Sequence, residues 1–100
     1  MKFTARERAG LRAMVEFARH YGADTPTSLS EVARAQDLSL PYLEQVVGSL
    51  RRAGLLDSVR GAHGGYRLTR EPATVRVGDV FRAVEGAIVS LDCIGDGATG

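Results

Sequence analysis

The sequence predicts a mainly α-helical fold, a winged helix-turn-helix with a two-stranded β wing. Two short helical patterns, at about 28–36 and 40–53, are separated by only a few residues, which is the arrangement of a helix-turn-helix unit. Two short apolar runs follow at once, and a basic, glycine-rich loop over 60–65 joins them. A strand pair directly after the second helix of such a unit makes it winged.

A first helix is expected over residues 5–22. Gly22 stands where a glycine commonly ends a helix. The apolar residues of this stretch recur every three to four positions. We expect five of them to form the buried face: Leu11, Met14, Val15, Ala18 and Tyr21.

The second and third helices have clear start signals. Ser28 and Glu31 form a capping box, so a short helix should begin there and run to about 36. Ser39 is the expected N-cap of the next helix, and Pro41 falls in its first turn, where a missing N–H costs nothing.

The third helix has the most regular apolar pattern. Its expected buried face is Leu43, Val46, Val47 and Leu50. At 100° per residue the opposite face is Pro41, Gln45, Gly48 and Arg52. Two pairs flank that outer face, Tyr42 with Ser49 on one side and Glu44 with Arg51 on the other.

The wing is expected to pair residues 55–59 with 66–69. Three glycines lie in the loop between them, at positions 61, 64 and 65. They supply positive φ angles and allow another backbone to approach closely. A fourth helix is expected over about 77–85, ended by Gly86.

Composition limits the function classes. One hundred residues with 44% hydrophobic composition suit one small domain. Residues 1–70 hold 11 Lys and Arg against 7 Asp and Glu, and residues 71–100 hold 2 against 5, so the positive charge lies where a nucleic-acid surface would need it. The single cysteine, the lack of an apolar leader and the lack of a membrane-length apolar run predict a cytoplasmic protein without disulfides.

Motifs of catalysis are missing from the sequence. It contains no G-x-x-x-x-G-K, H-E-x-x-H, G-x-S-x-G or C-x-x-C. No helix follows the glycine loop to make it a nucleotide cradle. We therefore expect no catalytic residues and no enzymatic activity.

A DNA-binding surface is the function that the pattern favours. The N-terminal half of the second helix of the unit enters the major groove, where Gln can pair with adenine and Glu can accept from cytosine. Arg60, at the base of the wing, can enter a narrow minor groove. The alternative for Arg60 is a surface ion pair with Asp57. The candidate DNA-binding residues are Ser39, Pro41, Tyr42, Glu44, Gln45, Arg51, Arg52, Arg60, Gly61, His63 and Gly64.

The chain resembles the bacterial winged-helix regulators typified by the iron–sulfur cluster regulator, the nitric-oxide-sensing repressor and the cysteine-metabolism repressor. The resemblance runs from Met1 to about Cys93. Three segments carry it: GLRAMVEFARHYG, SLSEVARAQDLSLPYLEQVVGSLRRAGLLDSVRGAHGGYRL and VRVGDVFRAVEG. It implies a homodimeric transcription factor, a repressor acting at a near-palindromic operator in double-stranded DNA. It also implies that Tyr42, Glu44 and Gln45 read bases, that Arg60 enters the minor groove and that Lys2 lies near the DNA backbone.

The sequence departs from the resemblance at its sensor. Cluster-binding relatives have three closely spaced cysteines after the fourth helix, and only Cys93 stands here. A cluster normally needs four protein ligands, so none is expected in this chain alone, although the full-length protein could hold one with Cys93 as a ligand. Alternatively, Cys93 is a redox thiol, or a small apolar residue without a sensing role.

These expectations divide the chain into a DNA-binding domain, 1–86, and the start of a cysteine-containing sensor region, 87–100, which we expect to be mobile or truncated. A different class of function stays open. A winged helix can serve as a protein–protein interaction module without specific DNA binding. In that case Tyr42 and the apolar segment 88–94 would form the interface.

Overall fold

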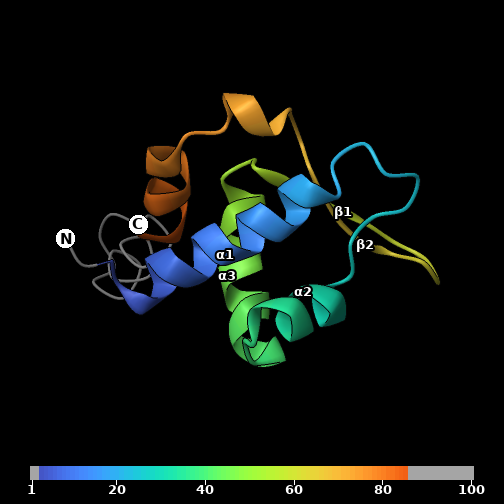
Figure 1. The fold of residues 1–100 in the computed structure, drawn as a ribbon, viewed down its shortest axis with the longest axis horizontal. Coiled ribbons are helices and arrows are strands. Elements are labelled where there is room, and N and C mark those ends of the chain that lie inside the picture. The colour runs from blue at the N-terminus through green and yellow to red at the C-terminus, as the bar shows by residue number, and fades with distance from the viewer. Residues whose placement is uncertain (1–2, 86–100) are drawn as a thin grey trace, which may run out of the picture.

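A computed structural model of the chain describes residues 3–85. Three helices come first, and a two-stranded antiparallel sheet follows them (Figure 1). The elements are α1 (Ala5–Arg19), α2 (Leu29–Gln36), α3 (Leu40–Arg52), β1 (Leu56–Val59), β2 (Gly65–Leu68), the short 3₁₀ helix η1 (Pro72–Thr74) and a helix over 77–85. The predicted winged helix-turn-helix is confirmed.

Helix α1 begins at a capping box that the sequence analysis overlooked. The Thr4 hydroxyl accepts a hydrogen bond from the Glu7 N–H at 3.0 Å, and the Glu7 carboxylate accepts one from the Thr4 N–H at 2.9 Å. The helix ends at Arg19 with His20 as its C-cap, so the expected end at Gly22 was wrong. Gly22 does have a positive φ, +85°, but it lies in the turn beyond the helix.

The predicted buried face of α1 was partly wrong. Val15 and Tyr21 are 55% and 45% exposed. Met14 and Phe17 are buried. The rest of the centre of the buried face is formed by three small residues: Ala9, Gly10 and Ala13. A Cβ on Gly10 would lie only 3.2 Å from side-chain atoms of Val80 and Val84, so the 77–85 helix packs closely there. A search for large apolar residues misses a contact of this kind.

The expected caps of α2 and α3 are confirmed. The Ser28 hydroxyl accepts from the Glu31 N–H at 3.1 Å, and the Ser39 hydroxyl accepts from the Tyr42 N–H at 3.3 Å. Asp37 is in the left-handed conformation, with φ 53°, which makes the sharp turn between the helices. Each start signal in the sequence therefore corresponds to a helix in the structure.

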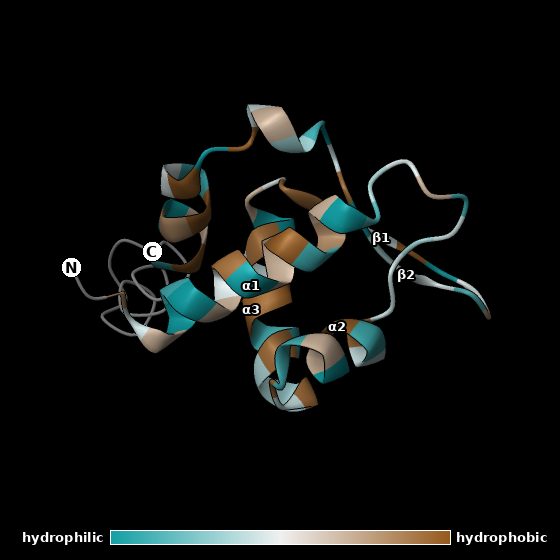
Figure 2. Cartoon of the chain, in the orientation of Figure 1, coloured by the Kyte–Doolittle hydropathy of each residue, from teal (hydrophilic) through white to brown (hydrophobic). Residues whose placement is uncertain are grey.

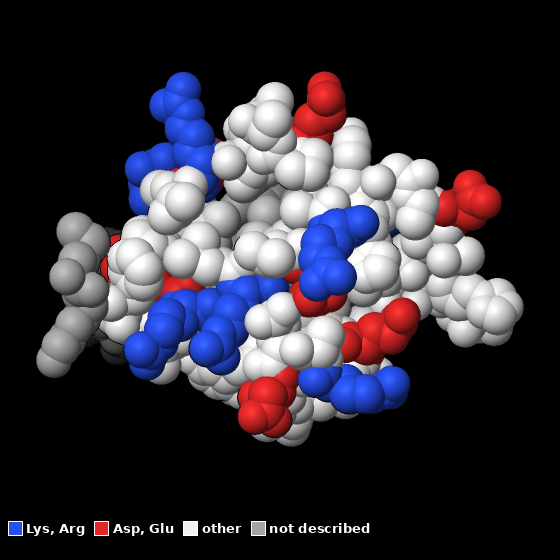
Figure 3. All heavy atoms as spheres, viewed as in Figure 1, with Lys and Arg blue, Asp and Glu red and all other residues white. Residues whose placement is uncertain are grey.

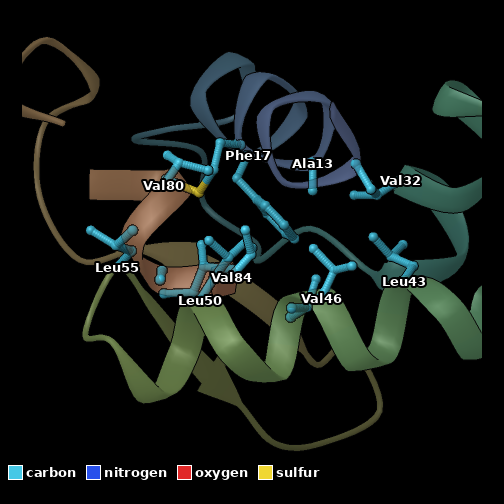
Figure 4. Packing of buried hydrophobic residues seen from close by; sticks show 14 of the residues in the cluster. Ala13, Phe17, Val32, Leu43, Val46, Leu50, Leu55, Val80 and Val84 are labelled. Carbon is cyan, nitrogen blue, oxygen red and sulfur yellow. The ribbon is translucent and has the colours of Figure 1, made fainter. Parts of the chain in front are cut away.

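The core lies between α1, α3 and the 77–85 helix. In Figure 4, Phe17 extends from α1 toward the side chains that α3 directs at it, while Val80 and Val84 close one side. The four apolar residues predicted for the buried face of α3 are all fully buried: Leu43, Val46, Val47 and Leu50. The helices alternate apolar and polar segments, as amphipathic helices do (Figure 2).

The wing pairs Leu56 with Leu68 at its base and Val59 with Gly65 at its tip. A third segment joins the sheet through an isolated antiparallel bridge. The Thr27 N–H donates to the Tyr66 carbonyl at 3.0 Å, and the Tyr66 N–H donates to the Thr27 carbonyl at 2.8 Å. The loop between α1 and α2 is thereby attached to the wing, an attachment that the sequence analysis did not predict.

Asp79 holds the beginning of the 77–85 helix. Its carboxylate accepts from the Arg76 N–H at 3.0 Å and forms ion pairs with Arg82 at 2.7 Å and Arg70 at 3.4 Å. The Arg76 N–H and the neighbouring arginines hold the pKa of Asp79 below its usual value. At the other end of the segment, the neighbouring carboxylate of Glu7 raises the pKa of Glu85 through a shared hydrogen bond and its charge.

Candidate nucleic-acid interface

Helix α3 presents a polar, exposed stripe in its first two turns. Pro41, Glu44 and Gln45 are exposed, on the side away from the buried residues of the helix. Ser39 is exposed too, but its hydroxyl is already engaged as the N-cap. The side chains of Glu44 and Gln45 are therefore the groups on this stripe that can make polar contacts to base edges.

Tyr42 differs from its neighbours because it is only half exposed. Its side chain packs against the apolar core cluster. A ring packed in this way has fewer rotamers available than a fully exposed one.

The C-terminal half of α3 contains two polar side chains, Ser49 and Arg52, that interact with each other, and Ser49 also interacts with α1. The buried Ser49 hydroxyl accepts a hydrogen bond from Arg6 of α1, Nη2 to Oγ at 3.1 Å. Arg52 lies back along the helix, with its own Nη2 at 3.5 Å from the same oxygen. A Cβ on Gly48 would lie 3.4 Å from Arg52 Nη1, which is an ordinary van der Waals contact. Arg51 is exposed.

The wing loop exposes Arg60, Gly61 and His63. Gly61 has a φ of +120°, and a Cβ on Gly64 would overlap the Val59 carbonyl, so both glycines are required by the turn. The alternative of an ion pair between Arg60 and Asp57 is not what the structure has: no carboxylate among residues 3–85 lies within 4 Å of the Arg60 guanidinium.

Two groups of candidates are therefore displayed, one on α3 and one on the wing, linked directly by β1. Lys2 and Cys93 lie outside the described residues. The contact between Arg6 and Ser49 is not predictable from the sequence, since 43 positions separate the two residues. A serine on a helix face that otherwise adjoins the core was the one available signal.

Basic side chains gather at more than one place on the visible surface. Figure 3 shows Lys and Arg atoms in one group over the N-terminal half of α1 and in another over the 77–85 helix, while acidic side chains lie at several separate places in the view. The basic excess predicted for the first 70 residues is thus not evenly distributed.

The described part of the chain was compared with what a metal site and a membrane-spanning helix each require. No three His, Cys, Asp or Glu side chains in residues 3–85 are grouped to hold a metal ion. With a single cysteine in the whole sequence, the residues present do not fit an iron–sulfur cluster, which needs four ligands. Within the same residues, no helix combines the length and the apolar character needed to cross a bilayer.

Residues 3–99 match the Rrf2 family, described as iron-dependent transcriptional regulators. The chain belongs to the Rrf2 family. Its relatives include the HTH-type transcriptional regulator CymR of Bacillus subtilis strain 168, 45% identical over 96% of this chain and 69% of that protein. The HTH-type transcriptional regulator IscR of Cereibacter sphaeroides is 42% identical over the whole of this chain and 64% of its own length. This Rrf2 chain thus spans about two thirds of those curated relatives.

Solved structures agree with the assignment of the fold. The structure of CymR (YrzC), the global cysteine regulator of B. subtilis, superposes with a TM-score of 0.80 at 46% identity, over 86% of this chain and 66% of that one. A T. potens IscR structure gives 0.79 at 48% identity, over 87% and 63%. The relatives of this Rrf2 chain are transcriptional regulators, which agrees with the expected class of function.

Proposed function

We propose that this chain is the DNA-reading part of a transcriptional regulator that acts as a repressor at a near-palindromic operator. The observation that carries the proposal is the pairing of an exposed polar stripe on α3 with an exposed arginine on a glycine-rich wing. Membership of a family of transcriptional regulators supports it. Residues 1–86 would form the reading domain, and the segment after it would belong to the control of binding.

The side chains on α3 would contact the major groove, and those on the wing would contact the minor groove. Helix α3 enters the major groove, where Glu44 accepts from a cytosine amino group, Gln45 pairs with adenine, and the Tyr42 ring contacts a thymine methyl or a phosphate. Arg60 follows the wing into the adjacent minor groove, with Gly61 and Gly64 allowing the loop to approach the sugar-phosphate backbone.

The remaining candidates would position the protein. Contacts to phosphates fix register without reading sequence. Arg51 and Arg52 at the end of α3, His63 at the wing tip, and Lys2 would contribute these, while Ser39 and Pro41 set the start of α3.

A homodimer would place two such surfaces on one operator. An apolar groove of about 160 Å³ lies away from α3, between α1 and the 77–85 helix, and Val15 and Val77, each 55% exposed, line it. Exposed apolar surface of this kind suits association with another chain. Control through Cys93 as a redox thiol is a further part of the proposal, and no step of DNA reading depends on it.

Titration against DNA at two salt concentrations tests the central proposal. Affinity for a mixed-sequence duplex should fall steeply with salt, because each neutralised phosphate lowers the slope of log K against log salt by about 0.9. Arg60→Ala should weaken binding and reduce the preference for A/T-rich flanks, and Arg12→Ala, which removes the same charge from an exposed position on α1, is the matched control. Binding that does not respond to salt would favour the protein–protein module instead.

A further inference from the structure

Two guanidinium groups meet at one buried hydroxyl beside the exposed stripe of α3. Arg6 Nη2 lies 3.1 Å from Ser49 Oγ, and Arg52 Nη2 lies 3.5 Å from the same atom. Ser49 is 1% exposed, and its hydroxyl donates to the Gln45 carbonyl at 3.3 Å. The serine thereby connects an arginine of α1 to an arginine of α3.

Like charges held this close repel each other unless an anion accompanies them. In the described part of the chain, no carboxylate lies within 4 Å of either guanidinium. The Nε of Arg6 is buried without a hydrogen-bond partner, although buried polar groups of arginine are ordinarily paired. The arrangement is therefore electrostatically incomplete in the protein alone.

The position of the pair on α3 indicates which anion completes it. Ser49 lies on the same flank of the exposed stripe as Tyr42, one turn after Gln45, whereas Arg51 lies on the opposite flank. A helix in the major groove has a phosphate backbone on each side, since the groove is only about 12 Å wide. The guanidinium groups of Arg6 and Arg52 lie at Ser49 on one flank of α3, and Arg51 lies on the other flank. Arginine groups on both flanks match the two rows of phosphates.

We propose that Arg6 and Arg52 form a phosphate clamp, in which both guanidinium groups bind one backbone phosphate of the DNA strand on the Tyr42 side of α3. The proposal rests on the DNA binding proposed above and extends the interface to α1. The planar fork of arginine suits the oxygens of a phosphate, which accept two parallel hydrogen bonds from it. Ser49 holds both side chains in place before DNA arrives, so less side-chain freedom is lost on binding.

The clamp is tested by removing its α1 half in the full chain and titrating with a mixed-sequence duplex. Arg6→Ala should reduce the magnitude of the slope of log K against log salt by about 0.9, which corresponds to one lost phosphate contact. The weakening should be alike for the operator and for unrelated sequences, since phosphate contacts carry no base information. Arg12→Ala should leave the slope unchanged.

A second variant separates binding from folding. Arg6→Gln removes the charge but keeps an amide that can donate to Ser49, and its slope should fall as that of Arg6→Ala does. Thermal melting by circular dichroism shows which variant is folded. If Arg6→Ala does not fold, the salt slope of Arg6→Gln tests the clamp.

The outcomes distinguish this clamp from the function on which it rests. If the wild-type chain binds DNA and the slopes of Arg6→Gln and Arg12→Ala both equal the wild-type slope, the clamp is overturned and the proposed function stands. If the wild-type chain itself shows no salt-dependent binding, the proposed function fails. A slope that falls only for the Arg6 variants supports the clamp.

Discussion

At the scale of single residues, Gln45 and Tyr42 illustrate two ways of reading DNA from one helix. Gln45 is exposed and free to turn its amide toward a base edge, whereas the Tyr42 ring is restricted by the core against which it packs. The exposed residue should set sequence preference, and the restricted one should set where the helix comes to rest.

Gln45→Ala should relax specificity at one base pair in each half-site, at a cost of about 1–3 kcal/mol for the preferred base, because a bidentate pair with adenine is lost. Selection from a random duplex library, followed by titration of the selected sequence and its single-base variants, measures this. Arg12→Ala should return the wild-type motif. A wild-type motif recovered with Gln45→Ala would contradict the role.

At the scale of elements, α3 combines a buried apolar face with a half-buried glycine, Gly48, one turn after Glu44 on the side away from the core. Glycine inside a helix is less stable than alanine by roughly 0.5–1 kcal/mol. A Cβ at position 48 meets only the flexible end of Arg52, at 3.4 Å, so packing within the protein does not require glycine. Close approach of DNA to the helix would require glycine at this position, because a side chain there would stand between the two backbones.

Gly48→Ala should therefore raise the free energy of unfolding by roughly 0.5–1 kcal/mol while weakening DNA binding. Chemical denaturation measures the first effect, and a binding titration under the same conditions measures the second. Ser30→Ala, on an exposed position of α2, provides a surface control. Unchanged affinity would mean that α3 does not lie close to DNA at this position.

The 77–85 helix has opposite pH responses at its two ends. The lowered pKa of Asp79 means that its ionised form is stabilised by folding, so its contribution is present above the unfolded pKa and lost as pH falls through the folded one. The raised pKa of Glu85 means that its contribution is present below the unfolded pKa and lost as pH rises through the folded one.

Asp79→Asn should lower the melting temperature at pH 7, with the difference from wild type disappearing in acid. Glu85→Gln should raise the melting temperature at pH 7, because one of two adjacent carboxylate charges is removed, and should have little effect in acid. Melting curves collected from pH 3 to pH 8 test both. Parallel curves for the two variants would contradict the assignment of opposite signs.

Local signals in the sequence predicted the elements well and their contacts less well. Ser28 and Ser39 mark helix starts because capping depends on residues only a few positions apart. The buried face of α1 was misjudged because Gly10 and Ala13 contribute by being small. The contact between Arg6 and Ser49 was out of reach because nothing local relates two residues on different helices. The exposed stripe of α3, by contrast, follows from helical geometry alone.

At the scale of the whole molecule, the proposed dimer makes operator spacing a geometric quantity. Two α3 helices on one face of DNA must lie about 34 Å apart, or one helical turn, to enter successive major grooves. Inserting about 5 base pairs between half-sites should turn one half-site to the far side of the duplex and weaken binding strongly, and inserting about 10 should restore much of it. Gel-shift titration with the two operators, against a single half-site as control, measures this. Equal affinity for all three would contradict binding as a symmetric dimer.

The bridge between Thr27 and Tyr66 has a consequence for redesign. Because β2 is paired on one side with β1 and, at Tyr66 near the tip, on the other side with the segment before α2, the orientation of the wing is held by contacts outside the loop over 60–64. That loop could be exchanged for one of different length or charge without refolding the rest of the protein. Minor-groove preference could then be altered separately from the bases read by α3, which makes the chain a suitable scaffold for regulators with new operators.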